Sequence, residues 1–261
     1  MSSVSPTILV FDSGLGGLTV FREVAKLRAD ARYVYAADDA AFPYGRLSEA
    51  ELSERVVSVM GGLIEAHRPD LVVVACNTAS TLVLEQLRGR FGVPFVGTVP
   101  AIKPACAASQ TKLVSVLGTE ATVTREYTRA LIRDFGQGCE VKLVGSRRLA
   151  VMAEEFLHGE PVDDDDIADE IEACFVQQNG MRTDTIVLAC THYPLLIEHL
   201  RRITPWPVTF LDPAPAIARR VTALIGDGRK DAKLLPGRMV FTSGRAPSAE
   251  LALALRGFGL N

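Results

Sequence analysis

The chain has 261 residues, of which 48% are hydrophobic and 23% are charged, and this is enough for one large domain or two of ordinary size. Its 28 Lys and Arg against 31 Asp and Glu give a net charge of −3, which argues against nucleic acid or an anionic membrane as a partner. The sequence contains neither a secretory signal pattern nor an apolar run of membrane-spanning length. Five cysteines without a CxxC pair fit free thiols in a reducing compartment, so we expect a cytoplasmic protein.

Short apolar runs alternate with helical patterns along the chain. Strands are predicted at residues 7–11, 33–36, 71–75, 95–96, 113–117, 141–144, 185–189, 208–211 and 238–242. Helices are predicted between them, for example at residues 52–67, 79–91, 122–135, 164–178 and 194–203. Unbroken apolar strands that alternate with helices predict an α/β fold with mostly parallel sheets covered on both faces.

The sequence contains an internal repeat. VVVACNTAS around Cys76 resembles IVLACTHYP around Cys190, and TILVFDSGLGG resembles LVSVLGTEATV. The repeat predicts two similar α/β domains related by a pseudo-two-fold axis, with the active site in the cleft between them, since such sheets bind ligands at the carboxyl ends of their strands. We expect the first domain to comprise residues 1–98 and 209–261, and the second to comprise residues 99–208.

Cys76 and Cys190 are the strongest candidates for chemistry. Either one alone is readily explained as a buried structural cysteine. As a pair they stand in matched settings, each at the end of an apolar strand and before a helix, where the helix dipole lowers the pKa of a thiol. Inverting a stereocentre requires a proton to leave one face and another to arrive on the opposite face. Two thiols on opposite walls of a cleft therefore predict an amino-acid racemase.

Two more titratable residues lie beside the expected strand ends. Asp12 follows the first strand in FDSGLGG, where it would either orient and deprotonate a thiol or cap a helix. The glycines permit a tight turn near a ligand but lack the spacing of a dinucleotide-binding motif. His192 is placed to modulate Cys190. A Cys-x-His zinc pair competes with that role, but it lacks a second pair of ligands, so no metal is expected.

Small polar residues at the predicted strand ends are candidates for holding the carboxylates and the ammonium of an acidic amino acid. Tyr44 and Gly45 lie in a loop, stiffened by Pro43, that is expected to cap the cleft. The remaining candidates are Asn77, Thr78, Thr119, Thr122 and Thr191.

The motifs that carry these residues resemble the glutamate racemases of the aspartate/glutamate racemase superfamily. In chain order they are FDSGLGGLTV, FPYGRLSEAEL, VVVACNTAST, VPAIKPA, LGTEATV and LACTHYPLL, and together they cover most of the chain. The combination of ACNTAS with CTHYPLL at this separation is far more specific than either motif alone.

This resemblance implies a cofactor-independent two-base racemase that interconverts L- and D-glutamate. It implies that Cys76 and Cys190 exchange the protons, that Asp12 supports the first and His192 the second. It also implies an auxiliary glutamate, which falls on Glu154 or its neighbour Glu155. The substrate contacts that it implies are Ser13, Tyr44, Gly45, Asn77, Thr78, Thr119 and Thr191.

The resemblance further implies a cytoplasmic homodimer that supplies D-glutamate for peptidoglycan and hence for cell shape. Two departures from the common pattern stand out: Ala41-Phe42, where many members have Arg, and Ser146-Arg147, where Cys-Pro is frequent. Both resemble the enteric-type subgroup, some of whose members are activated by a nucleotide-linked peptidoglycan precursor. Such a precursor is therefore a candidate partner.

Three alternatives are open at this point. The nearest is a racemase for aspartate or another amino acid on the same scaffold. A two-lobed amino-acid-binding protein would keep its ligand affinity whether or not its cysteines were intact. A thiol hydrolase that uses Cys190 and His192 would not require Cys76.

Overall fold

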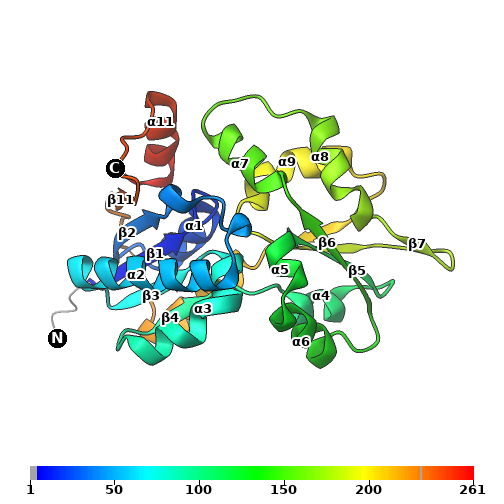
Figure 1. Cartoon of the computed structure of the whole chain (residues 1–261), viewed down its shortest axis with the longest axis horizontal. Coiled ribbons are helices and arrows are strands. Elements are labelled where there is room, and N and C mark those ends of the chain that lie inside the picture. The colour runs from blue at the N-terminus through cyan, green and yellow to red at the C-terminus, as the bar shows by residue number, and fades with distance from the viewer. Residues whose placement is uncertain (1–4, 230) are drawn as a thin grey trace.

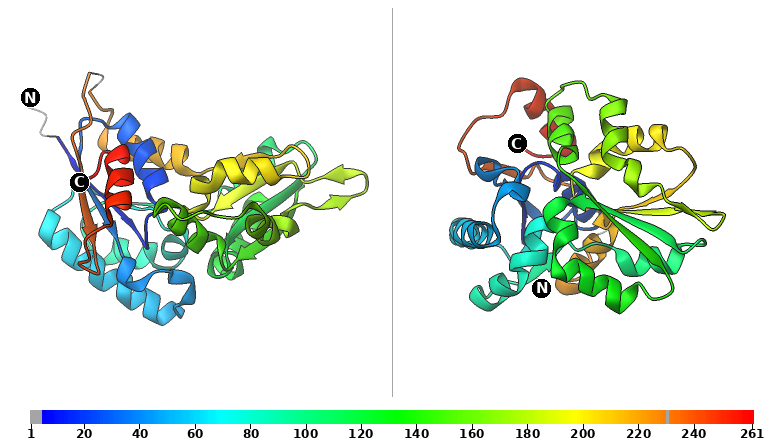
Figure 2. Two further views of the ribbon diagram at one scale, coloured as in Figure 1. Left: turned by 90° about the horizontal axis from the view of Figure 1, so that it is seen from above. Right: turned by 45° about the vertical axis from the view of Figure 1, so that its right-hand side comes forward.

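The computed structural model describes residues 5–229 and 231–261 and consists of two α/β lobes that lie side by side (Figures 1 and 2). The first lobe contains a five-stranded sheet in the order β11-β2-β1-β3-β4, and the second contains a four-stranded sheet in the order β10-β9-β5-β6. All neighbouring strands of both sheets are parallel. The prediction of an α/β fold with two parallel sheets is confirmed.

The first sheet is built from the strands β1 (Thr7–Asp12), β2 (Arg32–Ala37), β3 (Leu71–Val74), β4 (Phe95–Gly97) and β11 (Arg238–Phe241). Alternate side chains of each strand point to opposite faces, and each face has its own apolar core. One core is completed by the helices α1 (Leu18–Leu27), α10 (Ala214–Ile225) and α11 (Ala249–Phe258). The other is completed by α2 (Glu49–His67) and α3 (Asn77–Arg90).

The second sheet is built from β5 (Leu113–Thr119), β6 (Glu140–Ser146), β9 (Thr185–Ala189) and β10 (Thr209–Leu211). One face packs against α7 (Leu149–Leu157), α8 (Asp164–Ile171), the 3-10 helix η4 (Tyr193–Leu196) and α9 (Ile197–Ile203). The other face packs against α4 (Ile102–Ala108) and α6 (Glu126–Phe135). An antiparallel hairpin of β7 (Gln177–Gln178) and β8 (Met181–Arg182) projects from this lobe (Figure 2).

The two lobes repeat one topology. In the first lobe the strands run in the spatial order β2-β1-β3-β4, and in the second the equivalent order is β6-β5-β9-β10. The strands that end at Asp12 and before Cys76 are neighbours, as are those that end at Thr119 and before Cys190. The sequence repeat is therefore a structural repeat, to which β11 and α11 are additions in the first lobe.

Three sequence-based boundaries were wrong. Residues 209–211 form β10, which pairs with β9 as β4 pairs with β3, so they belong to the second sheet rather than to the first domain. The helix predicted at 122–135 is broken at Arg125, whose extended backbone separates α5 (Glu120–Thr124) from α6. The helix predicted at 164–178 ends early, because residues 177–178 pair with residues 181–182 in the hairpin. The rest of the predicted domain division stays a prediction.

A buried carboxylate joins four segments of the first lobe. Asp38 follows β2 and is fully buried, and it accepts hydrogen bonds from the Tyr44 hydroxyl (2.6 Å), the Arg55 guanidinium (2.9 Å from Nε) and the Thr242 hydroxyl (2.5 Å). It thereby ties the loop before α2, the helix α2 itself and the end of β11 to the end of β2. Burial raises the pKa of Asp38, but these donors outweigh that effect and hold its pKa below the ordinary value of 3.8.

Replacing this carboxylate, in Asp38→Ala, is expected to lower the free energy of unfolding at neutral pH by roughly 3 kcal/mol, because the Arg55 cation and the Tyr44 hydroxyl lose their partner. Since the pKa of Asp38 is lowered by folding, its contribution is present above pH 3.8 and is lost as the pH falls below that value. Urea unfolding of the wild type and of Asp38→Ala at pH 7 and at pH 3 measures the difference in the free energy of unfolding. An equal difference at the two pH values would contradict the assignment.

Candidate active site

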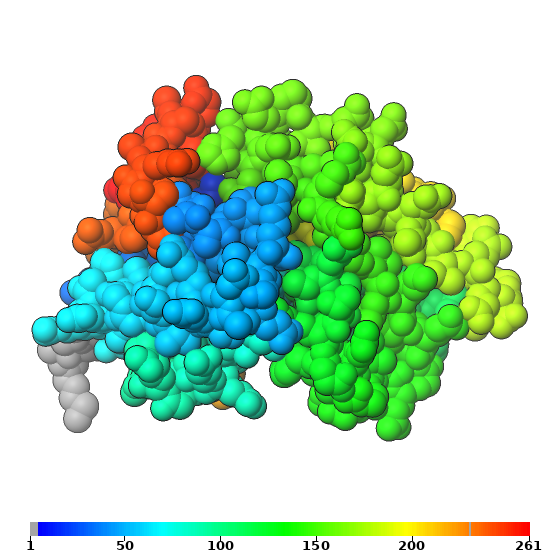
Figure 3. Space-filling view, in the orientation of Figure 1, coloured from blue at the N-terminus to red at the C-terminus, as the bar shows by residue number. Residues whose placement is uncertain are grey.

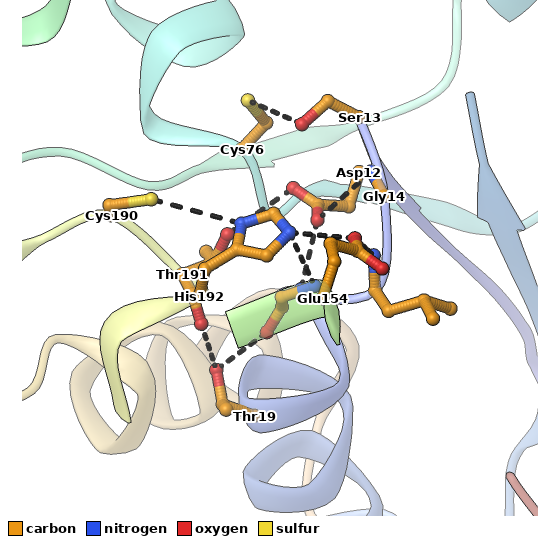
Figure 4. Close-up of polar contacts among 12 residues, drawn as sticks. Asp12, Ser13, Gly14, Thr19, Cys76, Glu154, Cys190, Thr191 and His192 are labelled. Atoms are coloured by element: carbon orange, nitrogen blue, oxygen red, sulfur yellow. Dashed lines mark hydrogen bonds and ion pairs between the residues drawn. The ribbon is translucent and has the colours of Figure 1, made fainter. Parts of the chain in front are cut away.

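The carboxyl ends of the two sheets face each other, and their loops touch. The Thr191 hydroxyl in the second lobe donates to Asp12 Oδ1 in the first at 3.4 Å, and the Thr19 hydroxyl on α1 donates to the Thr191 carbonyl at 3.1 Å. The Thr78 hydroxyl at the start of α3 lies 3.0 Å from that of Thr119 at the end of β5. Residues far apart in sequence thus share one site (Figure 4).

The glycine-rich turn after β1 makes this approach possible. Asp12 Oδ2 accepts the backbone N–H groups of Gly14 (3.3 Å) and Gly17 (3.0 Å), which folds the turn around the carboxylate. A Cβ atom on Gly14 would overlap the Glu154 carboxylate, and a Cβ atom on Gly16 would overlap the His192 imidazole. The glycines therefore serve close contact between the lobes.

Cys76 belongs to the first lobe, between β3 and α3. It caps the N-terminus of α3, where its sulfur accepts the Ala79 N–H at 3.5 Å and its thiol donates to the Ser13 hydroxyl at 3.7 Å (Figure 4). Only 5% of the residue is exposed. Burial, reinforced by the negative charge of Asp12, raises the pKa of Cys76 to about 12. The expectation of a lowered pKa was wrong for this cysteine, because desolvation outweighs the helix N-terminus.

Cys190 belongs to the second lobe, directly after β9, and has different neighbours. His192 Nδ1 lies 3.8 Å from its sulfur, and His192 Nε2 lies 2.8 Å from Glu154 Oε1 (Figure 4). The Leu15 N–H donates to the same Glu154 oxygen at 2.5 Å. Burial lowers the pKa of His192, but its bonds to Cys190 and Glu154 outweigh this and raise the pKa well above 6.5. The contacts with Cys190 and Glu154 favour the protonated form of the ring, whereas the Gly16 N–H, which donates to His192 Nε2 at 3.2 Å, favours an unprotonated Nε2.

The neighbouring glutamates have separate surroundings. Glu154 on α7 contacts His192, whereas Glu155 lines a different hollow together with Arg46 and Arg147. Geometry thus distinguishes two residues that the sequence left as alternatives.

Asp12 and His192 lie at the centre of the site. Asp12 is fully buried, and burial raises its pKa although the positive charge of His192 opposes the shift. Figure 4 draws the Asp12 carboxylate beside the imidazole, with Cys76 above and Cys190 to the left. Asp12 accepts the N–H of Gly17, the residue before α1, but no side chain caps that helix, and the charge of Asp12 raises the pKa of Cys76. The role of Asp12 toward the thiol stays a prediction.

Hydroxyl and amide groups complete the site. The hydroxyls of Thr78, Thr119 and Thr122 lie within 2.9–3.1 Å of one another across the two lobes. Asn77 is 2% exposed, and neither atom of its amide has a hydrogen-bond partner among the described residues. Buried amides are normally satisfied by a partner, so the Asn77 amide is free to bond a group other than the described residues.

Tyr44 and Gly45 were expected to contact the substrate, but the Tyr44 side chain is engaged elsewhere. Tyr44 is buried in the apolar core that includes Cys76, and its hydroxyl is used by Asp38. Gly45 is exposed and has open space where a side chain would be. A ligand would therefore meet the backbone of this loop rather than the tyrosine hydroxyl.

Sequence reasoning missed two contributors. Phe42 packs against His192 with ring centroids 5.3 Å apart, and Thr19 bonds the loop between Cys190 and His192. Phe42 carried a signal, because Arg is common near that position in the family that the motifs resemble. Thr19 carried none, since it lies inside a helix. Among the described residues, no three His, Cys, Asp or Glu side chains are grouped as metal ligands, and no helix is long and apolar enough to cross a membrane.

Comparisons with known proteins agree with this architecture. The Asp/Glu/hydantoin racemase family model matches residues 15–221. A glutamate racemase of Brucella anthropi is 52% identical over 97% of this chain and 92% of its own length, and one of Brucella abortus is 50% identical over 97% and 92%. The chain therefore belongs to the Asp/Glu/hydantoin racemase family.

Similar solved structures indicate which type of racemase within the family this chain is. Glutamate racemase of Escherichia coli, solved with L-glutamate and the activator UDP-MurNAc-Ala, superposes with a TM-score of 0.89 at 39% identity, covering 98% of this chain and 96% of that one. Glutamate racemase RacE1 of Bacillus anthracis gives 0.80 at 25% identity over 98% and 96%. Within its family the protein is thus a racemase of the glutamate type.

Replacing Glu154 with Gln is expected to lower the pKa of His192, because the imidazole loses one of the two partners that raise its pKa. Replacing Glu155 with Gln is the matched control and is expected to leave that pKa unchanged. NMR titration of the imidazole signals measures both, since the chain has only 4 histidines. Equal effects of the two substitutions would show that contact between Glu154 and His192 does not govern the imidazole.

Proposed function

We propose that the protein interconverts L- and D-glutamate by a two-base reaction in which Cys76 and Cys190 act on opposite faces of the α-carbon. The observation that carries this proposal is the position of the two thiols on the walls of different lobes, each with its own polar support. A single base cannot serve both faces of a fixed substrate. Two groups, one protonated and one not, exchange roles in each turnover.

The different surroundings of the thiols suggest how the resting enzyme is protonated. The raised pKa of Cys76 favours the neutral thiol there, ready to donate a proton. The role of proton acceptor is assigned to Cys190, whose sulfur lies 3.8 Å from His192 Nδ1. The Cys190 thiolate takes the α-proton and the Cys76 thiol delivers its own to the other face, which leaves a Cys76 thiolate and a Cys190 thiol.

The reverse reaction starts from that second state. The Cys76 thiolate must then exist in a buried environment, where the Ser13 hydroxyl and the Ala79 N–H are its hydrogen-bonding support. Asp12 disfavours it by charge, so protonation of Asp12, whose pKa burial raises, would ease its formation. The negative charge of Asp12 thus disfavours a thiolate at Cys76, whereas a positive charge on His192 would favour one at Cys190.

Substrate recognition is assigned to the polar groups between the walls. The unpartnered Asn77 amide and the hydroxyls of Thr78, Thr119, Thr122 and Thr191 offer donors and acceptors for the α-carboxylate and the ammonium group. Ser13 and the backbone of Tyr44 and Gly45 are assigned to the rest of the substrate. Glu154 is assigned the auxiliary role of holding His192 in its charged form.

The wider role is proposed from the resemblance to glutamate racemases. We infer that the product D-glutamate serves peptidoglycan synthesis in the cytoplasm and that the enzyme works as a homodimer. The Escherichia coli relative was solved with UDP-MurNAc-Ala as activator, so we propose a nucleotide-linked peptidoglycan precursor as a regulator of this chain too.

The activity is tested in deuterated water with L-glutamate as the only added reactant. Optical rotation is expected to fall to zero as D-glutamate forms, and mass spectrometry is expected to show one deuterium at the α-carbon. The assay is run with and without UDP-MurNAc-Ala, and with L-aspartate as a competing substrate. Absence of both inversion and exchange in the folded protein under all these conditions would refute the proposal.

The two-base assignment predicts that Cys76→Ala and Cys190→Ala each lower the rate of inversion by roughly a thousandfold or more, because each removes one proton carrier. Cys139→Ala is the control, since this half-buried cysteine lies outside the site, and it is expected to retain activity. Circular dichroism checks that each variant is folded. Retention of inversion by either site variant would exclude a shared role of the two thiols.

A further inference from the structure

The two lobes are joined by an ion pair outside the set of site residues. Arg125 lies at the break between α5 and α6 in the second lobe, and its Nη1 donates to Glu49 Oε1 in the first lobe at 2.8 Å. The Arg125 side chain is 6% exposed, whereas that of Glu49 is 72% exposed. A guanidinium that the second lobe carries is thus buried at the junction with the first.

Each residue of the ion pair is close in sequence to a segment of the site. Glu49 is the first residue of α2, directly after the loop that contains Tyr44 and Gly45, and the Ser48–Glu51 capping box fixes where that helix begins. Arg125 follows α5, which contains Thr122 of the threonine cluster, and its carbonyl accepts the Thr128 N–H. In Figure 3 the blue segment that contains the loop and the start of α2 lies against the green second lobe.

The cost of burying the Arg125 guanidinium is only partly offset by its contacts. Its Nε atom is buried and has no hydrogen-bond partner among the described residues. Burial lowers the pKa of the guanidinium, and the charge of Glu49 opposes that shift. Among the residues that the structure describes, Glu49 is the ion-pair partner of Arg125, so removal of its carboxylate leaves a buried cation that is poorly compensated.

Resting on the proposed function, we propose that Arg125 and Glu49 are positioning residues that hold the Tyr44–Arg46 loop of the first lobe against the threonine cluster of the second when substrate is bound. The pair acts on the distance between the two lobes. Among the described residues neither side chain forms a hydrogen bond with a thiol, although the charges of Arg125 and Cys76 influence each other. Without the Glu49 carboxylate, the buried cation favours separation of the lobes, where water solvates it. Substrate then binds more weakly, while the chemistry within a closed complex is unchanged.

The test uses the exposed partner, whose replacement leaves the core intact. Glu49→Gln is expected to raise KM for glutamate about fivefold, within the range of charged hydrogen bonds at partly exposed sites, and to change kcat much less. Glu126→Gln is the matched control, because it removes a neighbouring ion pair to Arg133 that lies wholly within α6, and KM is expected to stay the same.

A double-mutant cycle then isolates the pair. Arg125→Met removes the buried cation, so adding Glu49→Gln to it is expected to cause no further rise in KM. An unchanged KM in Glu49→Gln alone, or an equal rise from Glu49→Gln in both backgrounds, would overturn the proposal.

A measurement without substrate separates this proposal from the proposed function. Amide hydrogen exchange in the segment 44–52 is expected to be faster in Glu49→Gln than in the wild type, and unchanged in Glu126→Gln. If the wild type does not invert glutamate, this comparison still decides whether the pair holds the loop. Equal exchange in the wild type and Glu49→Gln would show that it does not.

Discussion

The site depends on a close approach of two sheet ends, and that approach depends on backbone without side chains. The turn after β1 passes so near His192 and Glu154 that Gly14 and Gly16 have no room for a Cβ atom. The Asp12 carboxylate holds the turn by accepting two of its N–H groups. Because the turn belongs to one lobe and the imidazole to the other, the same few atoms fix both the shape of the loop and the distance between the walls.

The two walls are related in topology but differ in electrostatics. Both cysteines follow the strand next to the first strand of their own lobe. Beyond that the repeat ends: Cys76 has a hydroxyl, a backbone N–H and a nearby carboxylate, whereas Cys190 has an imidazole that contacts a second carboxylate. The repeated backbone explains why each lobe presents a thiol. The pKa of Cys76 is raised because burial and the charge of Asp12 outweigh its hydrogen bonds with Ala79 and Ser13.

Much of this arrangement could be predicted from the sequence, because strand-to-helix junctions in parallel sheets have local signatures. Apolar runs ending at Asp12, Cys76, Thr119 and Cys190 were enough to indicate two sheets and one shared cleft. Properties that arise from packing could not be predicted. The pKa of Cys76 follows from burial by both lobes, and only contact with His192 separates Glu154 from Glu155. The break at Arg125 and the pairing of β10 likewise depend on tertiary contacts that no local pattern encodes.

The unequal walls have a consequence for kinetics. Enantiomers have the same free energy in water, so the equilibrium constant of a racemisation is one and the enzyme cannot change it. The specificity constants for the two directions must therefore be equal, however differently Cys76 and Cys190 are surrounded. His192 and Asp12 change the relative stability of the two protonation states of the enzyme. This change alters kcat and KM for each enantiomer but leaves the ratio kcat/KM equal for both. An enzyme with dissimilar walls is thus free to bind one hand of its substrate more tightly, but it must then turn that hand over more slowly in proportion.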